Sequence, residues 1–135
     1  MLSNKQINKI GDRIKQRADE ESLKNLINYR DQFLGPLFET SLNIKSLLRE
    51  SRLSFLLSGR LKRTKSIIRK LRREQNKNMD LTRMADIAGI RIIVNNINDQ
   101  DNLFAYLKTK FDIPKTFDYR EVDQNYKSLH FHILD

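Results

Sequence analysis

Apolar residues in the first part of the chain recur at intervals of three and four positions, with charged residues between them. This spacing places side chains on one face of an α-helix, so we predict an amphipathic helix from about Asn4 to Phe33. Its regular apolar positions are Ile7, Ile10, Ile14, Leu23, Leu26 and Ile27.

The adjacent residues Gly35 and Pro36 interrupt this pattern. Proline removes an amide donor and disfavours helical geometry in the residue before it. A second helix is predicted to follow, so that residues 1–50 form a helical N-terminal part. The residues expected to face inward from this second helix are Phe38, Leu42, Leu47 and Leu48.

Beyond a short stretch around Ser58 and Gly59 that is expected to be irregular, helical spacing returns between Thr64 and Arg73. A hydroxyl side chain at the start of a helix can accept a hydrogen bond from an unpaired amide, so Thr64 or Ser66 is expected to cap this helix. Its apolar positions are Ile67, Ile68 and Leu71.

The run GIRIIVNN at residues 89–96 is short, rich in β-branched residues and bounded by Gly and Asn, which is typical of a strand buried on both faces. A helix capped by Asn98 or Asp99 is predicted to follow and to continue to about Lys110. Its apolar side consists of Leu103, Phe104, Leu107 and Phe111.

Apolar and aromatic residues return in residues 128–134, where we predict a strand that pairs with the one beginning at Gly89. The order is then helices first, followed by strand, helix and strand. This order predicts an α+β fold, and 135 residues suit a single domain.

Composition adds a strong positive charge to this picture. The formal net charge is +9, from 26 Lys and Arg against 17 Asp and Glu, and such an excess attracts nucleotides, RNA or acidic lipid. The chain has no cysteine, which excludes disulfides and thiolate metal sites and favours the reducing cytoplasm. No apolar stretch approaches the length of a signal peptide or a membrane span, so no membrane partner is expected.

The densest charge lies in the segment GRLKRTKSIIRKLRR at residues 59–73, which holds eight Lys or Arg and no acid. Arg60 and Lys62 precede the predicted helix, whose N-terminus favours phosphate. Lys70 follows Ser66 by four residues, so both can meet one ligand on the same helix face. The alternative interpretation is a solvated basic helix face.

Two further motifs contain candidate site residues. The segment DIAGIR, residues 86–91, places Asp86 at the entry to the predicted strand, where a carboxylate suits Mg²⁺; the alternative is a capping aspartate in a turn. The segment NYKSLH, residues 125–130, offers Tyr126 as a stacking surface for a base and His130 as a donor or acceptor. The alternative here is a strand with a core tyrosine and a satisfied histidine.

These three motifs, in this order and at about this spacing, resemble the catalytic domain of RelA/SpoT alarmone synthetases. The small single-domain synthetases and related toxic synthetases are most similar, since the helical segment LINYRDQF also matches them. The resemblance implies a nucleotidyltransferase-like mixed β-sheet flanked by helices. Residues 51–135 would form its nucleotide-binding core within one domain spanning residues 1–135.

The resemblance also implies a role for each matching residue. Arg60 and Arg91 would bracket the adenine of ATP, and Lys62, Ser66 and Lys70 would contact its phosphates. Asp86 would be the catalytic carboxylate that holds Mg²⁺. On the acceptor side, Tyr126 would stack on the guanine of GDP or GTP, and His130 would belong to the same site.

The implied reaction transfers pyrophosphate from ATP to the 3′-hydroxyl of GDP or GTP. Family members carry a further strand with a Glu-x-Gln motif whose glutamate completes the metal site. The sequence ends at Asp135 before such a strand, so we expect a C-terminally incomplete domain. A possible homo-oligomer is also implied.

Three alternatives remain open at this point. One is a toxin-type relative that pyrophosphorylates the 3′ end of tRNA, which the basic segment would suit. Another is a catalytically inactive nucleotide-binding or alarmone-binding module. The last is a basic helical RNA-binding protein, which would leave DIAGIR and NYKSLH unexplained.

Overall fold

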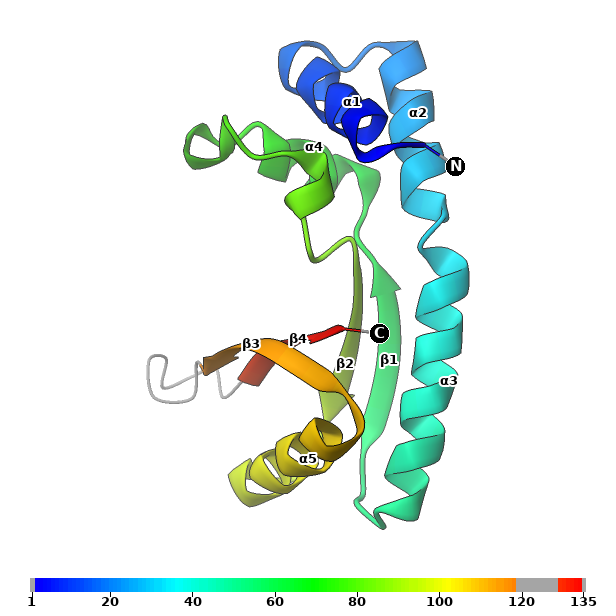
Figure 1. The fold of residues 1–135 in the computed structure, drawn as a ribbon, viewed down its shortest axis with the longest axis vertical. Helices are drawn as coiled ribbons and strands as arrows, with labels where there is room; N and C mark the ends of the chain where they lie inside the picture. The colour runs from blue at the N-terminus through cyan, green and yellow to red at the C-terminus, as the bar shows by residue number, and fades with distance from the viewer. Residues whose placement is uncertain (1, 119–128, 135) are drawn as a thin grey trace. The chain divides into compact units, whose positions relative to one another are not determined.

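A computed structural model describes residues 2–118 and 129–134 (Figure 1). It confirms the predicted α+β class. The elements, in chain order, are α1 (Asn4–Gln16), α2 (Glu20–Asp31), α3 (Leu34–Glu50), β1 (Leu56–Leu61), α4 (Thr64–Leu71), the 3₁₀ turns η1 (Glu74–Asn76) and η2 (Leu81–Arg83), β2 (Ala88–Ile93), α5 (Ile97–Lys110), β3 (Asp112–Asp118) and β4 (Leu129–Leu134).

The elements divide into two compact units. The first contains Met1–Ile44 and Leu57–Arg91, and the second contains Lys45–Leu56 and Ile92–Asp135. None of the helices in the described residues combines the length and the apolar character that a membrane crossing requires.

The single helix predicted over residues 4–33 is wrong, because the structure has two helices there. Ser3 caps α1 in a capping box with Gln6, whose backbone N–H donates to Ser3 Oγ at 3.2 Å. Asp19 caps α2 by accepting a hydrogen bond from the backbone N–H of Ser22 at 2.8 Å. Because Asp19 adopts the extended backbone of an N-cap, it starts a new helix and cannot continue α1. The apolar periodicity does not reveal this break.

Helix α3 begins at Leu34 and includes Pro36 in its first turn, where a missing amide costs little. The predicted inward face is partly wrong, since Phe38 and Leu42 are 65% and 51% exposed. The residues that α3 buries are Ile44 and Leu48.

The stretch around Ser58 and Gly59 was predicted to be irregular but belongs to strand β1, which pairs with β2 in a two-stranded sheet. Strand β2 alternates between half-buried and exposed positions, so the prediction of burial on both faces is wrong. The predicted caps of α4 are also wrong, because its N-cap is Arg63 and makes no side-chain cap bond.

The core of the first unit joins α1, α2, α4 and the segment that leads to β2, and Figure 1 shows these three helices grouped together. Asn8 Oδ1 accepts hydrogen bonds from the backbone N–H and the hydroxyl of Thr82, at 3.1 and 2.9 Å. Gly11 permits this close approach, because a Cβ there would meet Leu81 Cβ at 2.9 Å. The buried core residues are Ile7, Ile10, Ile14, Leu26, Tyr29, Ile67, Leu71, Leu81, Met84 and Ile87.

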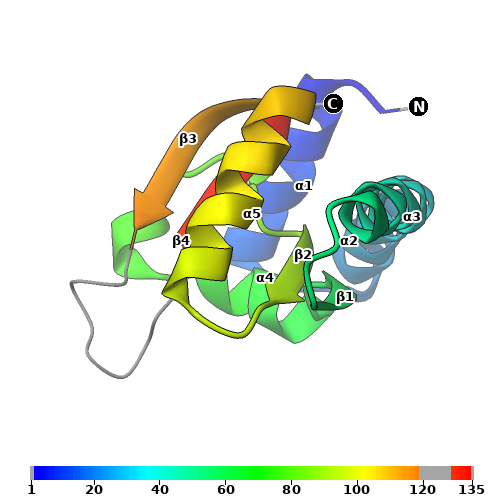
Figure 2. The ribbon, with the colours of Figure 1, turned by 90° about the horizontal axis from the view of Figure 1, so that it is seen from below.

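The second unit contains α5, which runs into β3 (Figure 2). The cap of α5 is Asn96 rather than Asn98 or Asp99, and its Oδ1 accepts from the backbone N–H of Asp99 at 2.8 Å. Leu103 and Leu107 are buried as predicted, and the Tyr106 hydroxyl donates to the Leu47 carbonyl at 3.1 Å.

Strand β4 lies within the segment predicted to be a strand, but its partner was predicted wrongly. In the described part of the chain it pairs antiparallel with β3, which the sequence analysis missed, and not with the strand at Gly89. Strands that follow one another along the chain need less loop-closure entropy to pair, which favours this arrangement.

Candidate functional site

Three side chains from three separate segments of the first unit meet at Asp86. Lys62, directly after β1, places Nζ 2.8 Å from Asp86 Oδ2, and Lys70 of α4 places Nζ 3.0 Å from Oδ1. The lysine side chains are 16% and 24% exposed, whereas Asp86 remains 50% exposed. Each carboxylate oxygen therefore has its own ammonium partner, and the carboxylate still faces solvent.

The pKa of Asp86 reflects two opposing effects. Partial burial raises it, but the hydrogen bonds and positive charges of Lys62 and Lys70 lower it by more, so the pKa lies below the ordinary aspartate value. Asp86 is consequently ionised at neutral pH, which a metal ligand requires.

Lys62 is held at both of its backbone polar groups. Its N–H donates to the Ile87 carbonyl at 2.7 Å, next to Asp86 in the chain. Its carbonyl accepts a hydrogen bond of 2.7 Å from Nε of Arg30, which comes from α2. Arg30 was not among the predicted site residues, and its role in positioning Lys62 follows from this contact alone.

Lys70 has a similar support at the end of α4. The side-chain amide of Asn76 donates to the Lys70 carbonyl at 2.8 Å, and the backbone N–H of Arg73 donates to the same carbonyl at 3.4 Å. Sequence reasoning missed this residue as well, because an asparagine after a helix has many equally common roles.

The other residues predicted for the ATP side lie in the same unit without joining this cluster. Ser66 is half-buried on α4, four residues before Lys70. Arg60 on β1 and Arg91 on β2 are exposed on two paired strands. Among the described residues, neither arginine makes an ion pair, so their predicted contact with adenine stays a prediction.

The two predicted acceptor residues lie wholly or partly outside the described residues. Tyr126 lies outside the described residues. His130 belongs to β4, where its backbone is in register with Phe117 of β3, but its side chain is outside the described part. Their predicted contacts with guanine stay predictions.

The donor set at Asp86 fits Mg²⁺ bound together with phosphates. Mg²⁺ usually takes one or two carboxylates and completes its shell with waters and substrate phosphates. Within residues 2–118 and 129–134, no group of three or more His, Cys, Asp or Glu side chains is arranged to hold a metal without such help. Asp86 would therefore supply one oxygen ligand, and waters and substrate phosphates would supply others.

The family of this chain follows from comparison with known proteins. A family model described as a region found in RelA / SpoT proteins matches residues 59–135, which include Lys62, Lys70 and Asp86. The chain belongs to the RelA/SpoT family. No curated protein matches it.

Solved structures agree on the fold of this RelA/SpoT chain. It is 21% identical to a GTP pyrophosphokinase family protein from Streptococcus pneumoniae, with a TM-score of 0.66 over 77% of this chain and 57% of that one. It is also 21% identical to small alarmone synthetase 1 from Bacillus subtilis, crystallised with its product pppGpp, with a TM-score of 0.67 over 82% of this chain and 63% of that one. The chain therefore spans less than two thirds of the length of either protein.

Proposed function

We propose that this RelA/SpoT chain binds ATP with Mg²⁺ and provides the donor half of a site that transfers pyrophosphate to the 3′-hydroxyl of GDP or GTP. The observation that carries the proposal is the cluster of Lys62, Lys70 and Asp86, which gathers two ammonium groups and a metal-type carboxylate at one point. Membership of the family and the pppGpp bound to one structural relative support the choice of nucleotides.

In the proposed reaction, the acceptor's 3′-oxygen forms a bond to the β-phosphorus of ATP, and the bond from that phosphorus to the bridging oxygen of the α-phosphate breaks. AMP leaves with the bonding electrons, and the hydroxyl proton passes to a base. Such transfers depend on positioning and charge neutralisation rather than on covalent help from the protein. Bound Mg²⁺ would contribute by neutralising phosphate charge.

The lysines have a specific part in this proposal. In the structure they neutralise Asp86, and each ammonium carries three donors, so a phosphate that arrives can take over part of their hydrogen bonding. Asp86 is then released toward the metal. Before ligand binds, the two lysines and Asp86 are thus held in ion pairs with one another, and the ligand replaces these ion pairs.

The remaining roles follow from the family resemblance. Ser66 would join the phosphate contacts from the same helix as Lys70, and the planar guanidinium groups of Arg60 and Arg91 would stack on adenine. Tyr126 and His130 would belong to the guanine nucleotide. Transfer to the 3′ end of tRNA is the competing acceptor, and the experiment below includes it.

The first test measures ATP affinity with and without Mg²⁺ in the 135-residue chain and its Asp86→Asn variant. Mg²⁺ is expected to raise the affinity of the native chain by roughly tenfold, since the cation can bind the nucleotide phosphates and the Asp86 carboxylate at the same time. In Asp86→Asn the Mg²⁺ effect should vanish. Affinity without Mg²⁺ should be equal or tighter, because both lysines are released.

Asp80→Asn is the matched control, because Asp80 is a carboxylate six residues before Asp86 in the chain and its side chain makes no cap hydrogen bond. It should retain the full Mg²⁺ effect. If Asp86→Asn retains it too, the proposed metal role of Asp86 is wrong.

The second test concerns the transfer itself. The chain, and a version extended at its C-terminus by a strand carrying Glu-x-Gln, are incubated with Mg²⁺, ATP labelled at the γ-phosphate, and either GDP, GTP or deacylated tRNA. Label is expected in GDP or GTP with the extended version. Label only in tRNA would change the acceptor, and label in none would refute the transferase proposal.

A further inference from the structure

The segment that joins Lys70 to Asp86 has little regular structure. The two residues are 16 positions apart, and between the end of α4 and the start of β2 the chain forms the 3₁₀ turns η1 and η2. Such short turns leave many backbone N–H and C=O groups without the repeating partners of a helix or sheet, and buried backbone groups need partners. The position of Asp86 therefore depends on the contacts that this segment makes with other elements.

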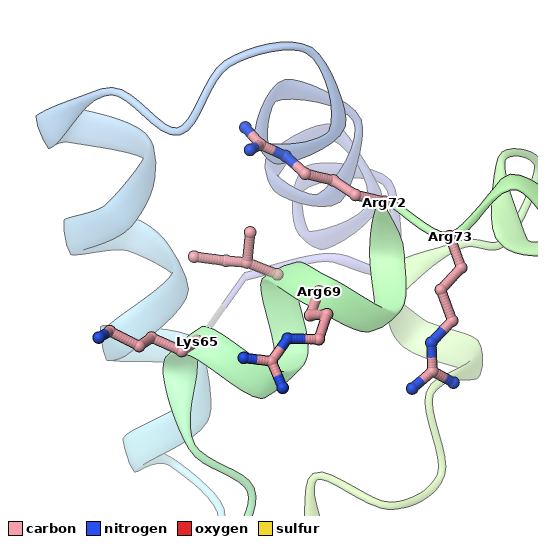
Figure 3. A pocket seen from close by; sticks show the side chains of 5 residues that line it. Lys65, Arg69, Arg72 and Arg73 are labelled. Carbon is pink, nitrogen blue, oxygen red and sulfur yellow. The ribbon is translucent and has the colours of Figure 1, made fainter.

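Helix α1 provides such contacts at the start and in the middle of the segment. At the start, Arg72 Nε donates to the Ile14 carbonyl at 3.0 Å, and Figure 3 shows the Arg72 side chain extending over α1. In the middle, Lys15 Nζ donates to the Lys77 carbonyl at 3.0 Å and also to the Met79 carbonyl. One ammonium group has three donors, so it can hold both carbonyls at once.

The contact nearest to Asp86 along this helix comes from Asn8. Its Oδ1 accepts hydrogen bonds from the backbone N–H and the hydroxyl of Thr82, four residues before Asp86, and both side chains belong to half-buried residues. On the other side of Asp86, the Ile87 carbonyl accepts from the backbone N–H of Lys62 at 2.7 Å. Asp86 therefore lies between two hydrogen-bonded points of the backbone.

The side chains that face the segment lie on one side of α1. Asn8, Gly11 and Lys15 are spaced by three and four residues, which places them in one row along a helix. Glycine is unfavourable inside a helix compared with alanine, but here a Cβ would meet Leu81 Cβ at 2.9 Å. The row, which we call the α1 stripe, therefore combines two polar side chains with the space that lets the segment reach them.

We propose that the α1 stripe positions the Asp86 carboxylate for Mg²⁺ and ATP, and that Asn8 is its principal positioning residue. The inference rests on the proposed function, since it concerns the same ligand. Burial of Leu81 and Met84 also holds the segment, but the hydrophobic effect is not directional, whereas a hydrogen bond fixes distance and angle. A misplacement of about 1 Å in a reactive site can cost about a hundredfold in rate.

The first experiment needs no nucleotide. A carbodiimide activates a carboxylate, and a neighbouring lysine amine then forms an amide with it while a urea leaves. The yield of cross-links from Lys62 and Lys70 to Asp86, measured by mass spectrometry in the 135-residue chain, therefore reports how closely these groups are held. Asn8→Leu should lower the yield by roughly fivefold, because the effective concentration of amine at the carboxylate falls as Asp86 moves.

A rescue variant separates positioning from general damage to the fold. Asn8→Asp should keep the yield within about twofold of the native chain, since a carboxylate oxygen can accept the same two hydrogen bonds. The cross-link between Lys77 and Glu74, whose charged groups are 3.9 Å apart, is the reference within each sample. Where Asn8→Leu does not fold, Thr82→Val removes the hydroxyl donor alone and should lower the yield by about twofold.

The second experiment measures ATP affinity. Asn8→Leu should reduce the Mg²⁺ effect from roughly tenfold to about twofold, because a displaced carboxylate no longer reaches a cation held by the phosphates. Affinity without Mg²⁺ should stay within about twofold, since the lysine ammonium groups remain. Lys9→Leu makes the same replacement at an exposed position of α1 and should leave both affinities unchanged.

The two experiments separate the two proposals. Unchanged cross-linking in both Asn8→Leu and Thr82→Val would overturn the positioning role, whatever the affinity for ATP. Equal loss in Asn8→Asp and Asn8→Leu would also overturn it, because the shared hydrogen bonds would then not matter. If cross-linking falls as expected but Mg²⁺ does not affect ATP binding even in the native chain, the positioning of Asp86 stands and the proposed function fails.

Discussion

The two flanks of α4 carry similar side chains in opposite electrostatic surroundings. On one flank, Lys70 shares the carboxylate of Asp86 with Lys62, which precedes the helix, and both lysines have little exposed surface. On the other, Lys65 and Arg69 are exposed and have no acidic partner among the described residues. A count of basic residues between positions 60 and 73 treats these lysines and arginines alike, although the fold gives them different partners.

The largest expected difference between the flanks is in ATP affinity. Lys62→Met with Lys70→Met should weaken ATP binding by at least about a hundredfold, because each of the two lost charge-assisted hydrogen bonds contributes about 1.5–3 kcal/mol. Lys65→Met with Arg69→Met should change ATP affinity by less than about threefold, since salt screens the charges of exposed side chains that do not contact the nucleotide. Fluorescence titration with an ATP analogue measures both, and equal losses would remove the distinction between the flanks.

A smaller effect is expected from Arg30, which acts on ATP only through Lys62. Arg30→Ala should weaken ATP binding by about tenfold, because the Lys62 carbonyl loses a charged donor and the lysine loses its fixed position. Arg30→Lys should restore much of the affinity, since an ammonium group can also donate to a carbonyl.

Lys24→Ala on the same helix provides the control for charge, because Lys24 is exposed. The melting temperature of each variant is measured alongside. If Arg30→Ala lowers stability but leaves ATP affinity intact, Arg30 supports the fold and does not position Lys62.

The smallest expected effect is on stability and depends on pH. Lys70→Met should cost about 0.5–1 kcal/mol of unfolding free energy at neutral pH, the range of a partly exposed ion pair, and Lys65→Met should be neutral within about 0.5 kcal/mol. The folded state lowers the pKa of Asp86, so its ion pairs stabilise the fold above the ordinary aspartate pKa of about 3.9 and lose this effect as pH falls through the folded value.

Denaturant unfolding of the three proteins between pH 3 and pH 7 tests this expectation. The difference between the native chain and Lys70→Met should shrink on acidification, while the Lys65→Met difference stays flat. A cost for Lys70→Met that does not change with pH would show that the lysine stabilises α4 by packing.

The sequence predicted the elements whose signals are periodic. Helix α4, strand β2 and helix α5 were located correctly because apolar residues repeat regularly or β-branched residues cluster within them. Strands β1 and β3 were missed, since one contains Gly59 and the other Pro114, and both residues are uncommon inside strands. The break at Asp19 was missed because the apolar spacing continues on either side of it.

The candidate site shows a similar division. Two separate motifs indicated Lys62, Lys70 and Asp86, and the structure brings these three residues together. Arg30 and Asn76 could not be predicted, because each donates to a backbone carbonyl, and every residue has such a carbonyl whatever its side chain.

The fixed backbone of Lys62 has a consequence for the speed of ligand entry. Because Ile87 and Arg30 hold its N–H and carbonyl, only the side chain must move when a phosphate replaces Asp86. Side-chain rotations take picoseconds to nanoseconds, whereas loop closures take up to microseconds. Association of ATP at Lys62 should therefore be limited by diffusion, so stopped-flow traces should show no slow phase. Hydrogen exchange at the Lys62 amide should not change when ATP binds.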